Sequence, residues 1–307
     1  MKKSVLCMDI GGSKLLTGEV DDTGKVIRQK RFLWNGRGNT AVMDQLYMTF
    51  ENLAENTAQF DRSYPVGLTI PGIADPEQGL WRSSTFLDVK DLPVSEEFAK
   101  RYGVSVALDN DANACAVAEK RFGGWENLND FLYMTVSNSI GAAFYSGGRL
   151  GRGYSGMAGE IGLLPTEDLL DSGHKICTLE SLASGRGLSE NYYRLSGKEN
   201  ISFMPADRLQ LMAEQGDPAA SEAFRLEAKY LARAIAMATF LLNPSEVILG
   251  GGVFCAGKIL MPAIVNDLHR EMKDYPGMLP KLGVTKLGYS GGLVGAAALA
   301  FAAAERM

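Results

Sequence analysis

The chain has 307 residues, 46% of them hydrophobic, and a formal net charge of -5 at pH 7. This length exceeds the usual size of one hydrophobic core and predicts about two domains, while the mildly acidic balance, without a run of Lys or Arg, argues against nucleic-acid binding as the main function. We find no signal peptide and no uninterrupted apolar run of ~20 residues, and the four scattered cysteines are typical of reduced thiols in a cytoplasmic protein that does not enter a membrane.

The first third of the chain alternates short apolar runs with turn signals and amphipathic segments. Glycine pairs and an Asp-Asp-Thr-Gly cluster separate the first three runs, which therefore predict an antiparallel meander. We expect helices at 40–60 and 94–102, and strands at 4–10, 15–20, 26–32, 65–70, 80–83 and 104–108. Strands followed by crossing helices are typical of an α/β layout.

The same pattern restarts after Gly124. A helix at 218–242 begins with a proline, which suits the first helical turn, and ends before Asn243-Pro244. We expect a glycine-rich segment at 147–162, an alanine-rich terminal helix at 293–304, and strands at 130–136, 141–145, 246–249 and 284–287. Both halves place a strand and a glycine turn early and helices late, which predicts two related α/β domains with a cleft between them.

A polar cluster, LDNDANA, joins the expected strand at 104–108 to a helix. Asp111 lies at this junction, where a side-chain oxygen can accept hydrogen bonds from the free N–H groups of the first helical turn. The N-terminal end of the helix dipole favours a carboxylate, so we expect Asp111 to cap the helix and to be ionised at neutral pH. The same position suits a catalytic base, and position alone leaves both interpretations open.

A second polar turn, DIGGSK, follows the first strand. Its glycines allow backbone N–H groups to approach a phosphate, Lys14 adds a cation, and Asp9 could hold a divalent metal or its water. A plain hairpin with a solvated Lys14 is the alternative interpretation.

The sequence does not support either of two common nucleotide-binding motifs. G-x-x-x-x-G-K-[ST], the Walker A pattern, is absent from the sequence. A match to G-x-G-x-x-G at Gly151, Gly153 and Gly156 follows a turn rather than a strand, which argues against a Rossmann dinucleotide site.

Six motifs occur in a fixed order along the chain: DIGGSK at 9–14, TIPGIADPEQG at 69–79, DNDANA at 109–114, GYSGMAGEIG at 153–162, LESLASGRGL at 179–188 and VILGGGV at 247–253. Together they resemble the ROK family of bacterial sugar kinases and related repressors, a branch of the actin/hexokinase-like ATPase superfamily. The resemblance covers nearly the whole chain. It implies two actin/ribonuclease-H-like α/β domains with a cleft between them, a small one at 1–110 plus 291–307 and a larger one at 111–290.

The resemblance also implies a role for individual residues. Asp111 matches the base that takes the proton from a sugar hydroxyl as its oxygen attacks the γ-phosphoryl group of ATP. Contacts with the sugar would come from Gly72, Thr85, Asn110, Glu160 and Glu180. Asp9 would face Mg2+, and the nucleotide would be bound by Gly11, Gly12, Ser13 and Lys14, by Asn138, Ser139 and Gly141 of a second phosphate loop, and by Gly250, Gly251 and Gly252.

The chain departs from the family pattern at a zinc site. The family carries a histidine after the Gly-Glu-Ile-Gly segment and then three cysteines, which together hold structural zinc. Here Leu163 occupies the histidine position and Cys177 alone remains, so zinc is not expected. We expect His174 to be a solvated loop residue, His269 to lie on a helix surface, and the sugar pocket to be more apolar, with Thr85 where an asparagine is usual.

The second phosphate loop departs as well. The family reads Gly-Thr-Gly-Ile-Gly where this chain reads Ser-Asn-Ser-Ile-Gly at 137–141. Ser and Asn can still donate hydrogen bonds to phosphate oxygens, and Asn tolerates left-handed backbone angles. Serine in place of glycine can instead crowd the nucleotide and reduce or abolish activity.

Three functions therefore stay open. The first is an ATP- and Mg2+-dependent kinase for a hexose, an amino sugar or a glycoside, with Asp111 as general base. The second is a catalytically weakened sugar-binding sensor or regulator of the same family; because the first strand begins at Ser4, we expect no DNA-binding domain before it. The third is a different actin-like ATPase that acts on an acid or a protein. Domain closure over the substrate is expected in each case, and a homodimer is implied by the resemblance alone.

Overall fold

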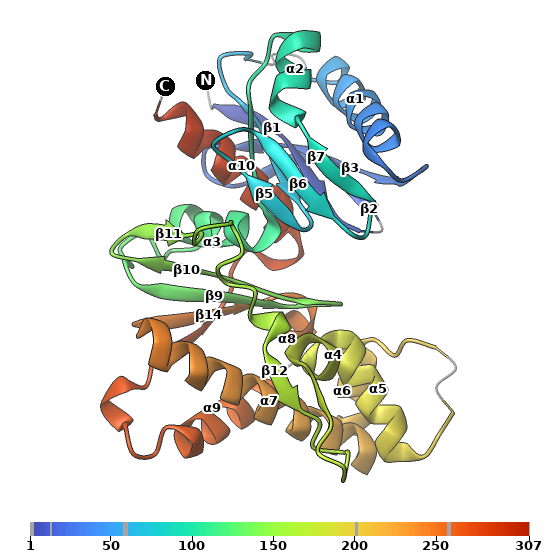
Figure 1. Cartoon of the computed structure of the whole chain (residues 1–307), viewed down its shortest axis with the longest axis vertical. Helices are drawn as coiled ribbons and strands as arrows, with labels where there is room; N and C mark the ends of the chain where they lie inside the picture. The colour runs from blue at the N-terminus through green and yellow to red at the C-terminus, as the bar shows by residue number, and fades with distance from the viewer. Residues whose placement is uncertain (1–2, 13, 58–60, 200–201, 257–258, 307) are drawn as a thin grey trace. The chain divides into compact units, whose positions relative to one another are not determined.

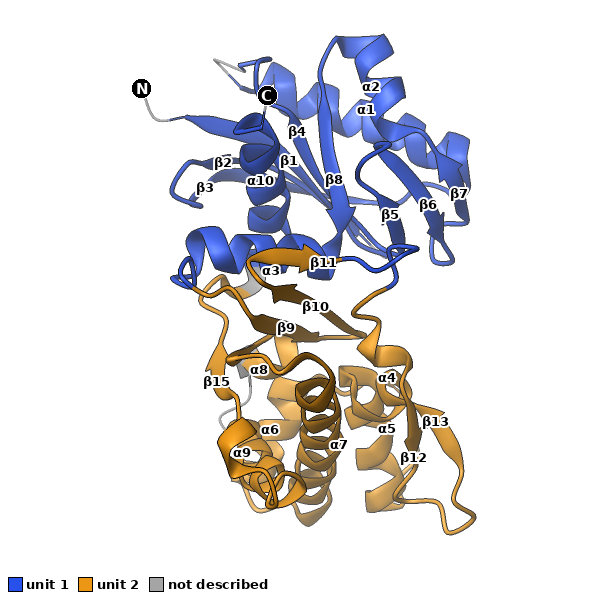
Figure 2. Cartoon of the chain, turned by 60° about the vertical axis from the view of Figure 1, so that its left-hand side comes forward, with its two compact units in different colours: residues 1–127, 152–157, 290–307 blue, residues 128–151, 158–289 orange. Residues whose placement is uncertain are grey.

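The computed structural model describes residues 3–12, 14–57, 61–199, 202–256 and 259–306. The chain forms two compact units (Figure 2). Unit 1 comprises Met1–Asn127, Arg152–Met157 and Ser290–Met307, and unit 2 comprises Leu128–Gly151 and Ala158–Tyr289. Helix α3 (Asp111–Phe122) thus belongs to unit 1, and the domain boundary at residue 110 that the resemblance implies stays a prediction.

Unit 1 is built on a five-stranded sheet with the order β3-β2-β1-β4-β8 (Figure 1). Its strands are β1 (Ser4–Ile10), β2 (Lys14–Asp21), β3 (Val26–Leu33), β4 (Val66–Ile70) and β8 (Val106–Asn110). The first three pair antiparallel, which confirms the predicted meander, and β4 and β8 continue the sheet in parallel with β1.

Parallel neighbours cannot be joined by a short hairpin, so longer connections lead from β1 to β4 and from β4 to β8. The first connection contains helix α1 (Asn39–Glu55). The second contains helix α2 (Val94–Tyr102) and a small antiparallel sheet of β5 (Ile73–Asp75), β6 (Leu80–Ser84) and β7 (Val89–Leu92).

Successive side chains of β1 point to opposite faces of this sheet, so its apolar residues contribute to a buried cluster on each face. Leu6 and Met8 belong to a buried cluster with residues of α1 and α2. Val5 and Cys7, which point to the opposite face, belong to a cluster with the terminal helix α10 (Gly291–Ala304). The alanine-rich terminal helix is therefore part of the core of unit 1, and Figure 1 shows α10 lying along the strands at the N-terminus.

Unit 2 repeats this plan. Its sheet has the order β11-β10-β9-β14-β15, with strands β9 (Phe131–Val136), β10 (Ile140–Ser146), β11 (Arg149–Gly151), β14 (Glu246–Gly250) and β15 (Lys281–Val284). Three sequential strands again pair antiparallel, and the two later strands run parallel to the first of them. The faint internal repeat in the sequence is thus a shared sheet topology.

Unit 2 also contains a hairpin of β12 (Pro165–Glu167) and β13 (Ile176–Thr178). Its helices are α4 (Leu179–Ala183), α5 (Gly185–Ser196), α6 (Ala206–Glu214), α7 (Pro218–Leu242), α8 (Gly252–Ala256) and α9 (Leu260–Glu271). The bounds predicted for α7 are confirmed. Asp217 caps its start by accepting a hydrogen bond from the Ala220 N–H at 3.0 Å, and Asn243 ends it in the left-handed conformation.

Two predicted strands are misplaced. Strand β8 begins at Val106 rather than at residue 104 and extends to Asn110, because the Thr69 and Ile70 positions of β4 pair with Asp109 and Asn110. Strand β15 ends at Val284, where the prediction began. It is a half-exposed edge strand, so its apolar pattern carries little register information. Among the described residues, no helix has the length and hydropathy required to span a membrane.

Candidate active site

The turn between β1 and β2 carries the first predicted phosphate loop. The Gly11 N–H donates to the Lys14 carbonyl at 2.9 Å, and the Trp34 indole N–H donates to the Gly11 carbonyl at 2.8 Å. Lys14 opens β2 with an exposed side chain. Ser13 lies outside the described residues. The hairpin is therefore confirmed, and its use as a phosphate loop stays a prediction.

Asp9 precedes this turn near the end of β1. The Thr69 hydroxyl donates to its Oδ1 at 2.7 Å, which fixes the carboxylate against β4. Burial raises the pKa of Asp9, while the Thr69 hydrogen bond and the charge of Lys14 act in the opposite direction. Mg2+ commonly uses one or two carboxylates together with substrate phosphates and water, so a single fixed carboxylate beside a glycine turn fits this ion.

The strand-to-helix junction at β8 and α3 differs from the prediction in one respect. The N-cap is Asn110, whose Oδ1 accepts a hydrogen bond from the Ala112 N–H at 2.9 Å, and Asp111 is the first residue of the helix. Both types favour this role, and the longer strand moves the cap by one position. The Asp111 carboxylate still lies in the first turn, is exposed, and accepts from the Ala112 N–H at 2.8 Å.

Two of the predicted sugar contacts are joined directly. The Asn110 side-chain amide donates to the Gly72 carbonyl at 3.0 Å, which orients the amide group next to Asp111. Thr85 is exposed in the turn between β6 and β7. Within unit 1, the structure thus fixes Asn110 on Gly72.

Glu160 and Glu180 are the two acidic residues predicted as sugar ligands in unit 2. Glu180 lies in the first turn of α4, and its Oε2 accepts a hydrogen bond from the Ile140 N–H at 3.0 Å. Glu160 precedes a short 3-10 helix, Ile161–Leu163. Reduced hydration raises the pKa of Glu160, and the negative charge of Glu180 raises it further. The two carboxylates are therefore close enough to influence one another.

The second predicted phosphate loop is the turn between β9 and β10. The Ser137 N–H donates to the Ser139 carbonyl at 2.9 Å, and the Gly185 N–H at the start of α5 donates to the Ser137 carbonyl at 2.6 Å. Asn138 is exposed at the tip, and Gly141 pairs with Thr135 in the sheet. The turn is thus held at Ser137 by α5 and at Ile140 by Glu180.

The glycines predicted to bind the nucleoside end strand β14. Gly251 has a φ of 91° and lies against the carbonyl of Val136, so a side chain there would overlap the last residue of β9. Gly250 packs against the Tyr133 hydroxyl, whereas a side chain at Gly252 would meet no atom within 4 Å. Gly252 is therefore the most open of these three positions.

Comparison with known proteins decides the family. The model of the ROK family matches residues 5–303. The chain belongs to the ROK family. A glucokinase from Thermotoga maritima is 31% identical over 293 residues, which cover 89% of this chain and 88% of that protein.

Other ROK relatives include kinases and regulators. The crystal structure of a ROK family glucokinase from Streptomyces griseus in complex with glucose and AMPPNP has a TM-score of 0.80 and 26% identity, covering 98% of this chain and 100% of the other. The DNA-binding transcriptional dual regulator NagC of Escherichia coli is 27% identical over 254 residues, which cover 77% of this chain and 63% of the regulator. The chain has the two-domain α/β fold of the ROK kinases.

The β12–β13 hairpin occupies the region where the family pattern places the zinc cluster. Leu163 is 55% exposed, and His174 is exposed in the hairpin loop, where its Nδ1 pairs with the Glu167 carboxylate. A second ion pair, between the buried Asp168 and Arg194 at 2.9 Å, ties the hairpin to α5. Over the described part of the chain, no group of three or more His, Cys, Asp or Glu residues is arranged to hold a metal ion.

An ion pair that the sequence analysis did not identify supports the β8–α3 junction. Asp109 is buried, and its Oδ2 accepts from the Arg152 Nη2 and Nε at 2.5 and 3.2 Å. Arg152 is separated from Asp109 by 43 residues and lies in the segment interpreted only as glycine-rich. The one available signal was that Arg152 immediately precedes the motif at 153–162.

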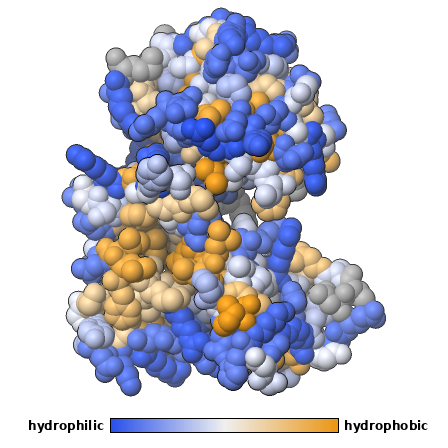
Figure 3. All heavy atoms as spheres, in the orientation of Figure 1, coloured by the Kyte–Doolittle hydropathy of each residue, from blue (hydrophilic) through white to orange (hydrophobic). Residues whose placement is uncertain are grey.

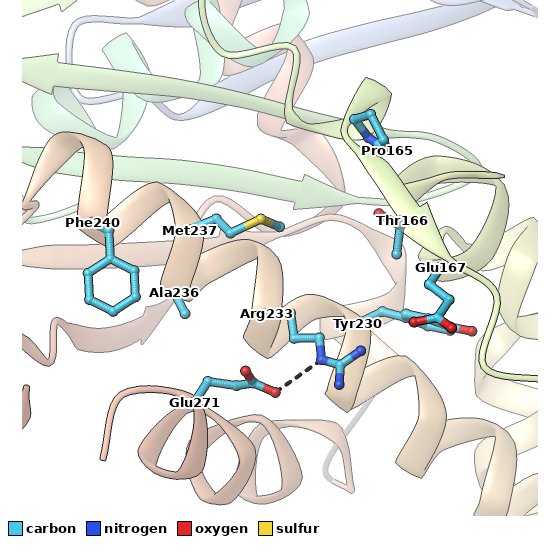
Figure 4. A pocket seen from close by; sticks show the side chains of 9 residues that line it. All are labelled: Pro165, Thr166, Glu167, Tyr230, Arg233, Ala236, Met237, Phe240 and Glu271. Atoms are coloured by element: carbon cyan, nitrogen blue, oxygen red, sulfur yellow. Dashed lines mark hydrogen bonds and ion pairs between the residues drawn. The ribbon is translucent and has the colours of Figure 1, made fainter. Parts of the chain in front are cut away.

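The surface of unit 2 also has a groove. It has a volume of about 310 Å³ and is lined by residues of β12, α7 and α9, among them Met237, Phe240 and an ion pair between Arg233 and Glu271 at 3.0 Å (Figure 4). Figure 3 shows apolar atoms gathered on this unit, where Leu241 is 82% exposed. None of the predicted site residues lines the groove, so we place the candidate site by its chemistry instead.

Proposed function

We propose that this ROK protein is an ATP-dependent sugar kinase that transfers the γ-phosphoryl group to a hydroxyl of a hexose, an amino sugar or a glycoside. The observation that carries the proposal is the β8–α3 junction. Asp111 presents an exposed carboxylate in the first turn of α3, directly after Asn110, whose amide is fixed on Gly72. Similarity to glucokinases, one of them solved with glucose and AMPPNP, supports the same function.

In the proposed mechanism, Asp111 accepts the proton of the sugar hydroxyl as its oxygen attacks the phosphorus. An ordinary aspartate is a weak base in water, with a pKa near ~3.9. Phosphoryl transfer nevertheless asks little of the base, because the transition state is loose and the proton moves late. Asn110 binds a neighbouring hydroxyl, and its hydrogen bond to Gly72 restricts the amide to one orientation.

Glu160 and Glu180 are proposed as further ligands of the sugar hydroxyls. Carboxylates form strong, charge-assisted hydrogen bonds with hydroxyl donors. Burial and the nearby charge of Glu180 both raise the pKa of Glu160 above its ordinary value.

The nucleotide is proposed to contact the turns after β1 and β9 and the Gly250–Gly252 turn. Lys14 supplies a positive charge, and backbone N–H groups of these turns supply donors for phosphate oxygens. Asp9 would hold Mg2+, which neutralises charge on the phosphates when bound. The homodimer remains a prediction of the family resemblance, and the cytoplasmic location remains a prediction from the scattered cysteines.

The test is a coupled ADP-release screen over hexoses, N-acetylhexosamines and β-glucosides, run with and without Mg2+. For the sugar that is turned over, Asp111→Asn should keep sugar binding within a few-fold by calorimetry and abolish turnover. Asp44→Asn, an exposed aspartate on α1, is the matched control and should behave like the wild type. Near-normal turnover by Asp111→Asn would overturn the assignment of the base.

A catalytically weakened sugar sensor is the second candidate, favoured by two observations. The turn after β9 carries side chains at Ser137, Asn138 and Ser139, and a transcriptional regulator is among the relatives. ATP binding without turnover across the whole sugar panel would support this candidate over the kinase.

A further inference from the structure

The buried carboxylate of Asp109 uses both of its oxygens. Oδ1 accepts from the Asn110 N–H at 2.8 Å and from the Asn113 side-chain amide at 2.9 Å. Oδ2 accepts from Nη2 and Nε of Arg152. The Asp109 side chain is 2% exposed, whereas that of Arg152 is 38% exposed. The acid therefore lies inside unit 1, and the arginine reaches it from the surface.

A carboxylate at this depth is unfavourable unless it is paired and hydrogen-bonded. Two of the four hydrogen bonds come from neutral donors, the Asn110 N–H and the Asn113 amide, and the two from Arg152 also bring a compensating charge. Two N–H groups of the planar guanidinium converge on the single oxygen Oδ2, so the contact has a defined direction as well as a charge. Removing Arg152 would leave the Asp109 charge buried with fewer donors.

The contacts of Asp109 surround the proposed base on both sides. Asn110 immediately precedes Asp111, and Asn113 lies two residues after it in the first turn of α3. By binding the backbone of one and the side chain of the other, Asp109 fixes the chain through the junction. A displacement of about 1 Å at a reacting group can lower a rate by about 100-fold.

Arg152 is also placed by its own segment. Residues Arg152–Met157 belong to unit 1, although the residues before and after them belong to unit 2. Arg152 follows strand β11 directly, and Gly156, farther along the segment, packs near the Ala74 carbonyl of β5. The segment thus contacts unit 1 through the ion pair of Arg152 and lies close to β5 at Gly156.

We propose that Asp109 and Arg152 are positioning residues. They hold the first turn of α3 in place and thereby keep the Asp111 carboxylate in the position that proton transfer requires. The expected effect of this ion pair on kcat rests on the proposed kinase function. Its effect on the rigidity of the β8–α3 junction can be measured by hydrogen exchange without any turnover.

The experiment uses the full chain with Arg152→Leu, Asp109→Asn, the double variant Asp109→Asn/Arg152→Leu, and Arg149→Leu as the matched control. Arg149 is an exposed arginine at the start of β11. Each variant is measured for kcat, KM of sugar and ATP, thermal stability, and hydrogen exchange of the amides of residues 106–113.

Arg152→Leu should lower kcat by about 10- to 100-fold, change KM for ATP by less than about 3-fold, and lower thermal stability. The double variant removes the buried charge together with its partner, so stability should recover while kcat stays low. Recovery of kcat together with stability would show a merely structural ion pair and overturn the proposal.

Hydrogen exchange separates this inference from the proposed function. If the wild type turns over no sugar, the kinase proposal fails, yet the junction amides of Asn110 and Ala112 should still exchange faster in Arg152→Leu and in the double variant than in Arg149→Leu. Unchanged exchange at the junction in both variants would overturn the positioning role, whatever the activity.

Discussion

The Glu180 carboxylate accepts a hydrogen bond from the backbone N–H of Ile140, with Oε2 and N 3.0 Å apart. Ile140 is the first residue of β10 and follows the turn predicted to bind phosphate. A residue predicted to bind the sugar therefore also supports the proposed nucleotide turn. This single contact gives unit 2 a direct physical link between the two proposed ligand sites.

Replacing Glu180 tests this link. Glu180→Ala removes the acceptor for the Ile140 N–H, and since a typical hydrogen bond contributes about 1 kcal/mol, the Kd for AMPPNP should rise about 5-fold. Glu180→Gln keeps an oxygen that can accept the same bond, so it should weaken sugar binding while changing the Kd for AMPPNP less than about 2-fold. Calorimetry with each ligand measures both effects, and Glu190→Ala on the exposed side of α5 is the control. Equal AMPPNP affinities for the Ala and Gln variants would contradict the link.

Side chains in the same turn give a second prediction. Replacing Ser137, Asn138 and Ser139 by Gly, Thr and Gly restores the pattern that the family resemblance describes. If the serines crowd the nucleotide, this triple variant should bind AMPPNP several-fold more tightly and raise kcat. Asn138→Thr alone is the control, since it leaves both serines in place. A weaker or unchanged AMPPNP affinity in the triple variant would show that the serines do not crowd the nucleotide.

Much of the fold could be predicted from the sequence because the pattern of burial is strong in its central elements. The apolar run of β1, the capped start of helix α7 and the alanine-rich run of helix α10 are each visible within a short window of sequence. β15 has no such pattern, because an edge strand with half-exposed residues is positioned by its partner β14. Register of this kind is set by long-range pairing, which a local pattern does not contain.

In the candidate site, too, local features could be predicted from the sequence and long-range contacts could not. Asn110 and Asp111 could be placed at a strand-to-helix junction, but two adjacent cap-forming residues left the exact cap one position uncertain. The support from Arg152 depends on a contact across 43 residues and could not be inferred from spacing. The binding of sugar, ATP and Mg2+ by the named residues remains a prediction.

Gly292 offers a third test, directed at the proposed metal ligand. A Cβ on Gly292 of α10 would lie 2.5 Å from Oδ1 and from Cγ of Asp9, so Gly292→Ala must displace the carboxylate or the helix. We expect the Mg2+ concentration for half-maximal activity to rise several-fold. Gly277→Ala, where an added Cβ meets no atom within 4 Å, is the matched control. An unchanged Mg2+ requirement in a folded Gly292→Ala protein would argue against Asp9 as the metal-facing acid.

Glu227 provides a prediction about stability that is independent of catalysis. It lies in the middle of α7 with 0% exposure, and within the described structure neither carboxylate oxygen has a hydrogen-bond partner. Burial raises the pKa of Glu227 well above its ordinary value, so the folded protein keeps this proton at pH values where the unfolded chain has released it. The stability associated with the protonated group is therefore complete below the unfolded pKa, near pH 4.5, and declines as the pH rises toward the folded pKa.

Glu227→Gln removes this titration while preserving the shape of the side chain. The free energy of unfolding should then fall less steeply between pH 4.5 and neutrality, by up to about 1.4 kcal/mol per pH unit for one proton. Glu227→Leu should in addition stabilise the protein by about 1–3 kcal/mol, because it removes an unsatisfied buried polar group. Glu222→Gln is the control on the same helix: its ion pair with Arg225 lowers the pKa of Glu222, so its pH effect has the opposite sign. Denaturant unfolding across this pH range measures all four proteins, and parallel curves for the wild type and Glu227→Gln would show that Glu227 does not hold its proton in the folded state.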